Sequence, residues 1–245
     1  AYSQLPNVAD LTGSHIVATQ PVAVFGGHEE AVLGWSGGGE DSCCAEHVEE
    51  QLLPVQAWGK SYVLPKTAPR GSEADLWIVM ASLPGTKVTT NPPINGLDGH
   101  TFQSGGQWVQ VESTESFTLE ATGPVQVAQF IVSQQQTDDW IGDPTMIVHS
   151  PMNQMRKDYF ILTPVGYSKN YVSVLRVAGA EVKADGLAIA ASEFKKVGDG
   201  TWELAYHSVT PGLHRFETSA TAFGLSVYGY GNATAYGYPG GMNLQ

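Results

Sequence analysis

The sequence predicts an all-β protein made of two antiparallel β-sandwich lobes, jelly-roll-like, with one short helix in a long loop. The main observation is period-two alternation in short runs rich in β-branched and aromatic residues. Glycine, proline and asparagine separate these runs, and successive runs start roughly ten residues apart, which is typical of sandwiches. The runs that predict strands are residues 15–18, 21–25, 76–80, 108–111, 125–130, 159–162, 171–175 and 225–228.

A repeated pattern predicts that some of these strands form hairpins. Residues 15–24 contain two apolar runs around Pro21, and residues 117–127 repeat this arrangement around Pro124. Residues 214–227 form a looser third copy. Since an isolated hairpin cannot bury its apolar face, we expect each copy to close a core.

The predicted helix covers residues 45–53, with Val48, Leu52 and Leu53 on its apolar side. It lies in a long excursion from Gly26 to Gly59. The predicted organisation follows from these elements. Residues 1–59 form an N-terminal hairpin and a loop–helix excursion packed on the body, residues 60–136 form the first sandwich lobe, and residues 137–245 form the second.

The charge balance excludes some classes of partner. Lys plus Arg number 12 and Asp plus Glu number 24, so the formal net charge is −12. Without a basic run the chain cannot displace phosphate counterions, which argues against nucleic acid and against anionic membrane surfaces. No apolar run approaches the ~20 residues of a spanning helix, so we expect no membrane insertion.

Cys43 and Cys44 are adjacent, a spacing that suits neither zinc nor a redox motif. The alternatives are a disulfide between these neighbours, two free thiols, or pairing outside this segment. In an oxidising compartment the neighbouring disulfide is favoured, and it would hold a glycine-rich loop in place.

The most site-like group is His28, Glu29, His47 and Glu50. On the predicted helix, His47 and Glu50 lie one turn apart and share a face. If that helix packs over the end of the strand carrying His28 and Glu29, two imidazoles and a carboxylate converge on a ligand. A purely structural role for these side chains is the alternative, and the absence of a His-Glu-x-x-His sequence leaves a zinc hydrolase unsupported.

A second acidic group consists of Asp138, Asp139 and Asp143, beside Trp140. Its carboxylates could serve glycoside hydrolysis or, with backbone carbonyls, form an oxygen cage for calcium. The alternative is a solvated turn. We therefore expect no cofactor, with calcium as a weak candidate.

Aromatic residues indicate a recognition site more strongly than the acidic and histidine groups do. Tyr236 and Tyr238 alternate with glycine, so their rings would lie on one face of a strand where they could stack on sugars or anchor a protein. The alternative is a last strand packed on the sandwich. Trp35 lies in the long excursion and is the third aromatic that we expect to contact a ligand.

Several segments together resemble the IgGFc-binding protein N-terminal domain family. They occur in family order over nearly the whole chain. The matching pieces are residues 13–17, 21–25, 27–29, 44–54, 58–60, 143–146, 185–186, 212–214 and 236–241. In the family a cysteine usually follows Gly-His-Glu and pairs with the one before Glu-Gln-Leu. Here Glu30 stands at that position and Cys43 has appeared beside Cys44, so the resemblance implies a changed loop closure.

The resemblance implies an extracellular, β-rich adhesion or recognition module. We expect a non-catalytic protein that binds a surface glycan or an extracellular protein and is one part of a larger multidomain protein at the cell surface. Two alternatives stay open: a metal-dependent or carboxylate hydrolase of polysaccharide or peptide, and a structural unit of a surface fibre. Fold alone does not decide among them.

Overall fold

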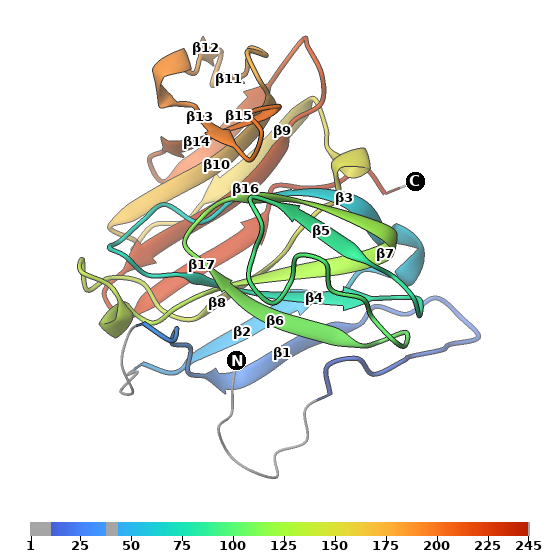
Figure 1. Ribbon diagram of the computed structural model, residues 1–245. Helices are drawn as coiled ribbons and strands as arrows, with labels where there is room; N and C mark the ends of the chain where they lie inside the picture. Colours follow the sequence, from blue (N-terminus) through green and yellow to red (C-terminus); the bar gives the residue numbers. More distant parts are fainter. Residues whose placement is uncertain (1–10, 38–43, 245) are drawn as a thin grey trace.

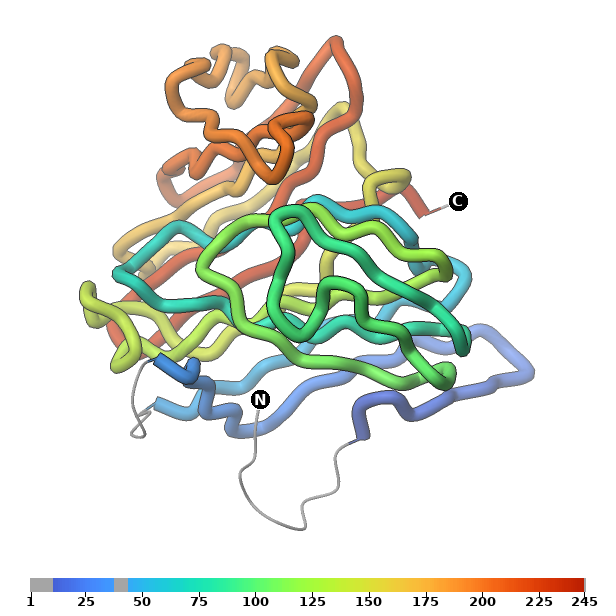
Figure 2. Tube along the Cα trace, viewed as in Figure 1, coloured from blue at the N-terminus to red at the C-terminus, as the bar shows by residue number. Residues whose placement is uncertain are grey.

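The computed structural model describes residues 11–37 and 44–244 (Figure 1). Over these residues the protein is all-β, as predicted, with antiparallel sheets in a sandwich-like arrangement. The described helical turns are short 3-10 turns, at Val55–Ala57, Gln134–Gln136, Met152–Gln154 and Ala191–Glu193. Figure 2 shows the first described residues running along the face opposite the segment that carries the small β11 and β12 strands.

The first half of the fold is built on the long strand β7 (Phe117–Ile131). The first part of β7 pairs with β3 (Gly59–Leu64) and β5 (Val88–Asn91). Its second part pairs with β4 (Asp75–Ala81) and β8 (Thr145–Val148). The core between these two layers also receives side chains from β6 (Trp108–Ser113), which pairs with β4. We call residues 59–148 the first sandwich.

A bulge lets β7 serve both layers. Ser61 lies opposite Glu120 and Gly59 lies opposite Val125, so four residues of β7 face Lys60 alone. Pro124 has no amide hydrogen to donate, and its carbonyl accepts a hydrogen bond from the Ser82 amide at 3.0 Å. The hairpin predicted around Pro124 is therefore wrong, because the chain bends through a bulge and continues as one strand.

The predicted helix at residues 45–53 is also wrong. Its centre forms strand β2 (Glu46–Gln51), which pairs antiparallel with β1 (Phe25–Ala31). Val48 is buried between the exposed His47 and Glu49, a period-two pattern that a strand satisfies and a helix does not. A two-turn helix gains little by itself, whereas the strand buries Val48 against Phe130 and Val148 of the first sandwich. The β1–β2 hairpin thus forms a third layer (Figure 1).

The other two predicted hairpins are wrong as well. Residues 15–18 and 21–24 form no strand, and Ile16 and Val17 stay 57% and 80% exposed because no sheet lies beside them. In the third copy both strands exist, as β15 (Gly212–Glu217) and β16 (Gly224–Gly231), but they belong to different sheets. The predicted strands at residues 76–80, 108–111, 159–162 and 171–175 are confirmed.

The second sandwich, residues 158–239, has two facing sheets. One has the order β13-β14-β10-β16-β17 and the other the order β12-β11-β15-β9. Apolar residues from both sheets, with Phe216 and Val227 among them, form the core between them. The remaining bounds are β9 Asp158–Thr163, β10 Lys169–Val177, β11 Lys183–Ala184, β12 Leu187–Ala188, β13 Lys195–Val197, β14 Trp202–Ser208 and β17 Thr234–Pro239. Whether the two sandwiches are separate domains stays a prediction.

Buried charges occupy the joint between the two sandwiches. The Lys66 Nζ lies 3.0 Å from a carboxylate oxygen of Asp75 and 3.2 Å from one of Glu73, and all three side chains are nearly inaccessible to solvent. The Arg70 guanidinium donates to the carbonyls of Ile141 at 2.7 Å and Val132 at 3.0 Å. Two cations and two carboxylates thus neutralise one another. We call Lys66, Arg70, Glu73 and Asp75 the charge cluster.

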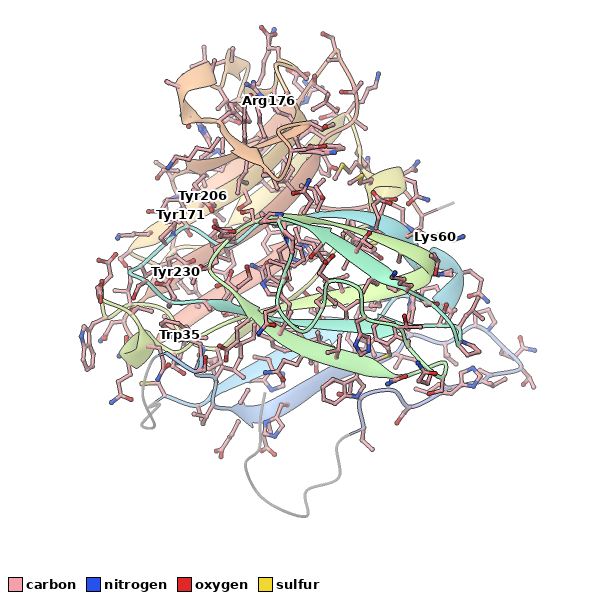
Figure 3. All side chains as sticks on the ribbon, in the orientation of Figure 1. Trp35, Lys60, Tyr171, Arg176, Tyr206 and Tyr230 are labelled. Atoms are coloured by element: carbon pink, nitrogen blue, oxygen red, sulfur yellow. The ribbon has the colours of Figure 1, made fainter. Side chains whose placement is uncertain are left out.

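Tyrosines of the second sandwich close this cluster. The Tyr228 hydroxyl accepts from the Ala68 amide at 2.8 Å, and the Tyr230 hydroxyl donates to the Ala68 carbonyl at 3.1 Å. Arg70 also lies over the Tyr230 ring, 4.6 Å from its centre. Figure 3 shows Tyr171, Tyr206 and Tyr230 at this joint. The second sandwich is therefore anchored by hydrogen bonds as well as by apolar contact.

We expect Asp75→Ala to lower the free energy of unfolding by about 3–5 kcal/mol, because it leaves two buried cations, Lys66 and Arg70, with Glu73 as the one remaining carboxylate of the cluster. The matched control is Asp139→Ala, which breaks the exposed pair with Lys169 at 2.7 Å. That change should cost less than about 1 kcal/mol. Urea unfolding curves measure both values. Equal losses for the two variants would show that the charge cluster does not stabilise the joint.

Candidate functional site

The predicted His28, Glu29, His47 and Glu50 group lies on the β1–β2 hairpin, but it does not converge as expected. His28, Glu29 and His47 are exposed, and His47 Nε2 lies 3.7 Å from Glu49 on its own strand. His47 and Glu50 are three positions apart, and in a strand such as β2 this separation places their side chains on opposite faces. Three of the four side chains face solvent, and Glu50 turns toward the body.

Glu50 on β2 and Asp143 just before β8 are two carboxyl groups whose pKa values are raised by burial. Burial raises the pKa of Glu50 to about 7, although the Val148 amide donates to its carboxylate. Burial, and then the nearby Glu46, raise the pKa of Asp143 to about 7, against the opposing effect of Arg70. One oxygen of each carboxyl, Glu50 Oε1 and Asp143 Oδ1, is buried without a hydrogen-bond partner. For a buried carboxyl group the neutral form is less costly than the charged form, so the stability of this contact is expected to depend on pH.

Trp35 packs on the same apolar cluster that receives the hairpin. It is half-buried against residues that include Leu33 and Phe130. Its amide donates to the Gln136 side chain at 3.1 Å, and the next amide, of Ser36, donates to Glu112 at 2.9 Å. Figure 3 shows Trp35 on the lower side of the molecule near the hairpin, and its intermediate burial leaves part of the side chain accessible.

Tyr236 and Tyr238 belong to the last strand, β17, and both are half-buried. The Tyr236 hydroxyl donates to Asn170 at 2.7 Å, and the Tyr238 hydroxyl donates to the Leu162 carbonyl at 2.7 Å. Gly237 faces β8, where an added Cβ would lie 2.7 Å from Ile147. The alternating glycine thus allows close approach of the first sandwich, and the tyrosines have structural partners.

The acidic group at residues 138–143 separates in the structure. Asp138 and Asp139 are exposed, and Asp139 pairs with Lys169, whereas Asp143 is buried. Among the described residues, no three His, Cys, Asp or Glu side chains come together as a group that could hold a metal ion. Calcium binding by this chain stays a prediction.

The predicted disulfide between Cys43 and Cys44 involves a residue outside those that the structure describes. Cys44 itself is described, with a positive φ of 73°. The pairing stays a prediction.

The structure also shows a surface that sequence reasoning missed, on the outer face of β9 and β15. Phe160, Leu162 and Leu213 are 63%, 63% and 68% exposed. Leu213 lies opposite Leu162, and Arg215 lies opposite Phe160, so the four side chains adjoin on one face. We call them the apolar strip. The sequence did carry a signal for this surface, since residues 159–162 are apolar at four consecutive positions. A strand in a sheet with one buried face buries only every second side chain, so two of these four must face outward.

The profile of the family described as IgGFc binding protein matches residues 2–229. The chain belongs to the IgGFc-binding protein family. A curated relative, the human IgGFc-binding protein, is 30% identical over 259 aligned residues, which cover 96% of this chain. These residues are 4% of the human protein, so the chain spans a small part of that relative. No solved structure matches this member of the IgGFc-binding protein family.

Within residues 11–37 and 44–244, the IgGFc-binding family member has no helix long and apolar enough to cross a membrane.

We expect Glu50→Gln to remove part of the pH dependence of folding. The pKa of Glu50 is about 7 in the folded state against an ordinary value of 4.5, so its neutral form is the one that folding favours. The stability from this group is present below about pH 4.5 and is lost as the pH rises through about 7. Urea unfolding at about pH 5 and about pH 8 should show a larger decrease for the natural protein than for Glu50→Gln. The control is Glu49→Gln at the exposed neighbouring position, and an identical pH response of all three proteins would contradict the assignment.

We expect Trp35→Ala to lower the free energy of unfolding by about 2 kcal/mol, roughly half the loss for a fully buried tryptophan. The half-buried ring contacts the cluster beneath the hairpin, so its removal leaves apolar surface uncovered. Thermal or urea unfolding measures the change. An unchanged midpoint would show that the ring serves an external contact only.

Proposed function

We propose that this chain is a non-catalytic, extracellular recognition module whose main partner is a protein, and that the apolar strip contacts this partner. The observation that carries the proposal is the strip itself. Exposed apolar patches of adjoining large side chains mark interaction sites, and aromatic residues and arginine are enriched in protein interfaces. Membership of the IgGFc-binding protein family supports a protein partner.

The strip is built in a way that suits binding. Arg215 donates to both oxygens of Asp158, at 3.1 and 3.0 Å, and also approaches Glu217 at 3.0 Å. The Arg215 guanidinium lies 5.5 Å from the centre of the Phe160 ring. These contacts hold the arginine and the aromatic ring in fixed positions, so binding loses little side-chain entropy.

The hairpin residues His28, Glu29 and His47 are a second candidate contact, since they are exposed on the opposite end of the fold. A surface glycan as the partner, a hydrolase, and a structural unit of a fibre are the competing functions. Internal hydrogen-bond partners for Tyr236 and Tyr238 give the glycan alternative less support at that strand.

The human IgG Fc fragment is the first probe, because the human relative carries that binding activity in its name. We expect the natural protein to bind immobilised Fc, and Leu162→Asp to weaken binding at least about tenfold by placing a charge in an apolar contact. Leu83→Asp is the matched control, since Leu83 is 54% exposed on the first sandwich. Equal losses for both variants would contradict the role of the strip. A protein that ignores Fc but binds a neutral glycan on an array would support the glycan alternative.

A further inference from the structure

A hollow of about 260 Å³, open to solvent, lies at the edge of the second sandwich. It is lined by Arg156, Asp158, Tyr159, Phe160 and Gly240. Strand β9 is the last strand of its sheet, and Gly240 directly follows β17 of the facing sheet. The hollow therefore lies between the edge strands of the two sheets, near the end of the described chain. We call it the edge pocket.

The edge pocket offers a cation that forms no ion pair with any other described residue. Within the described part of the chain, the Arg156 guanidinium has no carboxylate within 4.0 Å, and it is exposed. The carboxylate of Asp158 is already held by both arms of Arg215. Arg215 is paired with both Asp158 and Glu217, so Arg156 is the positive charge that this pocket leaves for a ligand, on a chain whose net charge is −12. An anion is thus favoured at this place although it is repelled by the protein as a whole.

The pocket also offers an aromatic face and open backbone groups. Phe160 is 63% exposed. The amide and carbonyl of Leu162 both bond the Tyr238 hydroxyl, at 3.2 and 2.7 Å, on the side of β9 away from β15. Backbone groups of an antiparallel strand alternate in direction, so those of Phe160, two residues earlier, also point away from β15. They are positioned to pair with a ligand.

We propose that the edge pocket binds a terminal acidic sugar. The sugar carboxylate pairs with Arg156, whose planar fork matches a carboxylate. The apolar face of the sugar ring packs on Phe160, and its hydroxyls donate to Asp158 and to the Phe160 carbonyl. This inference goes beyond the proposed function, because it assigns a second ligand to a pocket beside the apolar strip.

A sugar fits this geometry better than an acidic peptide does. A peptide added to the β9 edge needs the backbone groups of alternate residues along the strand. The Tyr238 hydroxyl already bonds the amide and the carbonyl of Leu162. An added peptide strand could therefore pair with Phe160 but not with Leu162, the next residue of β9 whose backbone groups point outward. A sugar also brings several hydroxyl groups next to its carboxylate, and the Asp158 carboxylate accepts hydrogen bonds from hydroxyls.

The test compares two matched pairs of probes by NMR titration of the natural protein: methyl β-glucuronide against methyl β-glucoside, and 3′-sialyllactose against lactose. In each pair the first probe carries the carboxylate. We expect saturable binding of an acidic probe and at least about tenfold weaker binding of its neutral counterpart, because a hydrogen bond to a charged group contributes about 1.5–3 kcal/mol. Arg156→Gln should remove that preference. No Fc is present, so the result is independent of the proposed protein contact.

Lys157→Gln is the control, since it removes the neighbouring positive charge without changing a residue that lines the pocket. It should leave binding within about twofold, and the melting temperature of Arg156→Gln should match that of the natural protein because Arg156 has no buried partner. The proposal is overturned if neither acidic probe binds more tightly than its neutral counterpart, or if Arg156→Gln and Lys157→Gln weaken binding equally. Binding of acidic peptides, without binding of the sugars, would overturn it in favour of a protein ligand.

Discussion

The joint between the two sandwiches depends on buried charge rather than on apolar contact alone. Lys66 lies between the carboxylates of Asp75 and Glu73, and Arg70 is fixed by two backbone carbonyls and by the Tyr230 ring. A buried ion pair gains little over an apolar pair, but a single unpaired member is very unfavourable. The cluster therefore tolerates only the arrangement in which every partner is present, and this arrangement fixes how the second sandwich sits on the first.

A fixed joint has consequences for recognition. The β1–β2 hairpin lies at one end of the molecule, and strands β9 and β15 lie in the second sandwich (Figure 1). These two strands carry the apolar strip, and β9 borders the edge pocket. Strands rather than loops carry Phe160, Leu162, Leu213 and Arg215, so their positions relative to one another are set by the sheet register. Such a surface is already organised before a partner arrives, which lowers the entropic cost of binding. The hairpin differs, since it is attached through an interface that contains Glu50 and Asp143.

The acidic character of the chain acts differently at these places. Over the whole surface a net charge of −12 favours solubility and disfavours anionic partners. Beneath the hairpin, burial raises the pKa of Glu50 and of Asp143 to about 7, and the nearby Glu46 adds to the rise at Asp143. At the edge pocket, Arg215 neutralises Asp158 and leaves Arg156 available. The acidic composition thus gives a surface that repels anions and a contact beneath the hairpin whose stability depends on pH. At the edge pocket, Arg156 attracts an anion locally.

The sequence by itself determined the all-β class, the family, and the strands whose apolar residues alternate, such as residues 76–80 and 171–175. It could not determine the helix-or-strand choice at residues 46–51, because Val48 is buried only once β2 packs on the first sandwich. It could not distinguish a turn from a bulge at Pro124, since that depends on β3 and Ser82 from elsewhere in the chain. The candidate site shows the same limit. Residue types suggested His28, Tyr236 and Tyr238, but only tertiary structure decided which side chains find internal partners and which face solvent, because burial is a property of the packed neighbours and not of the residue.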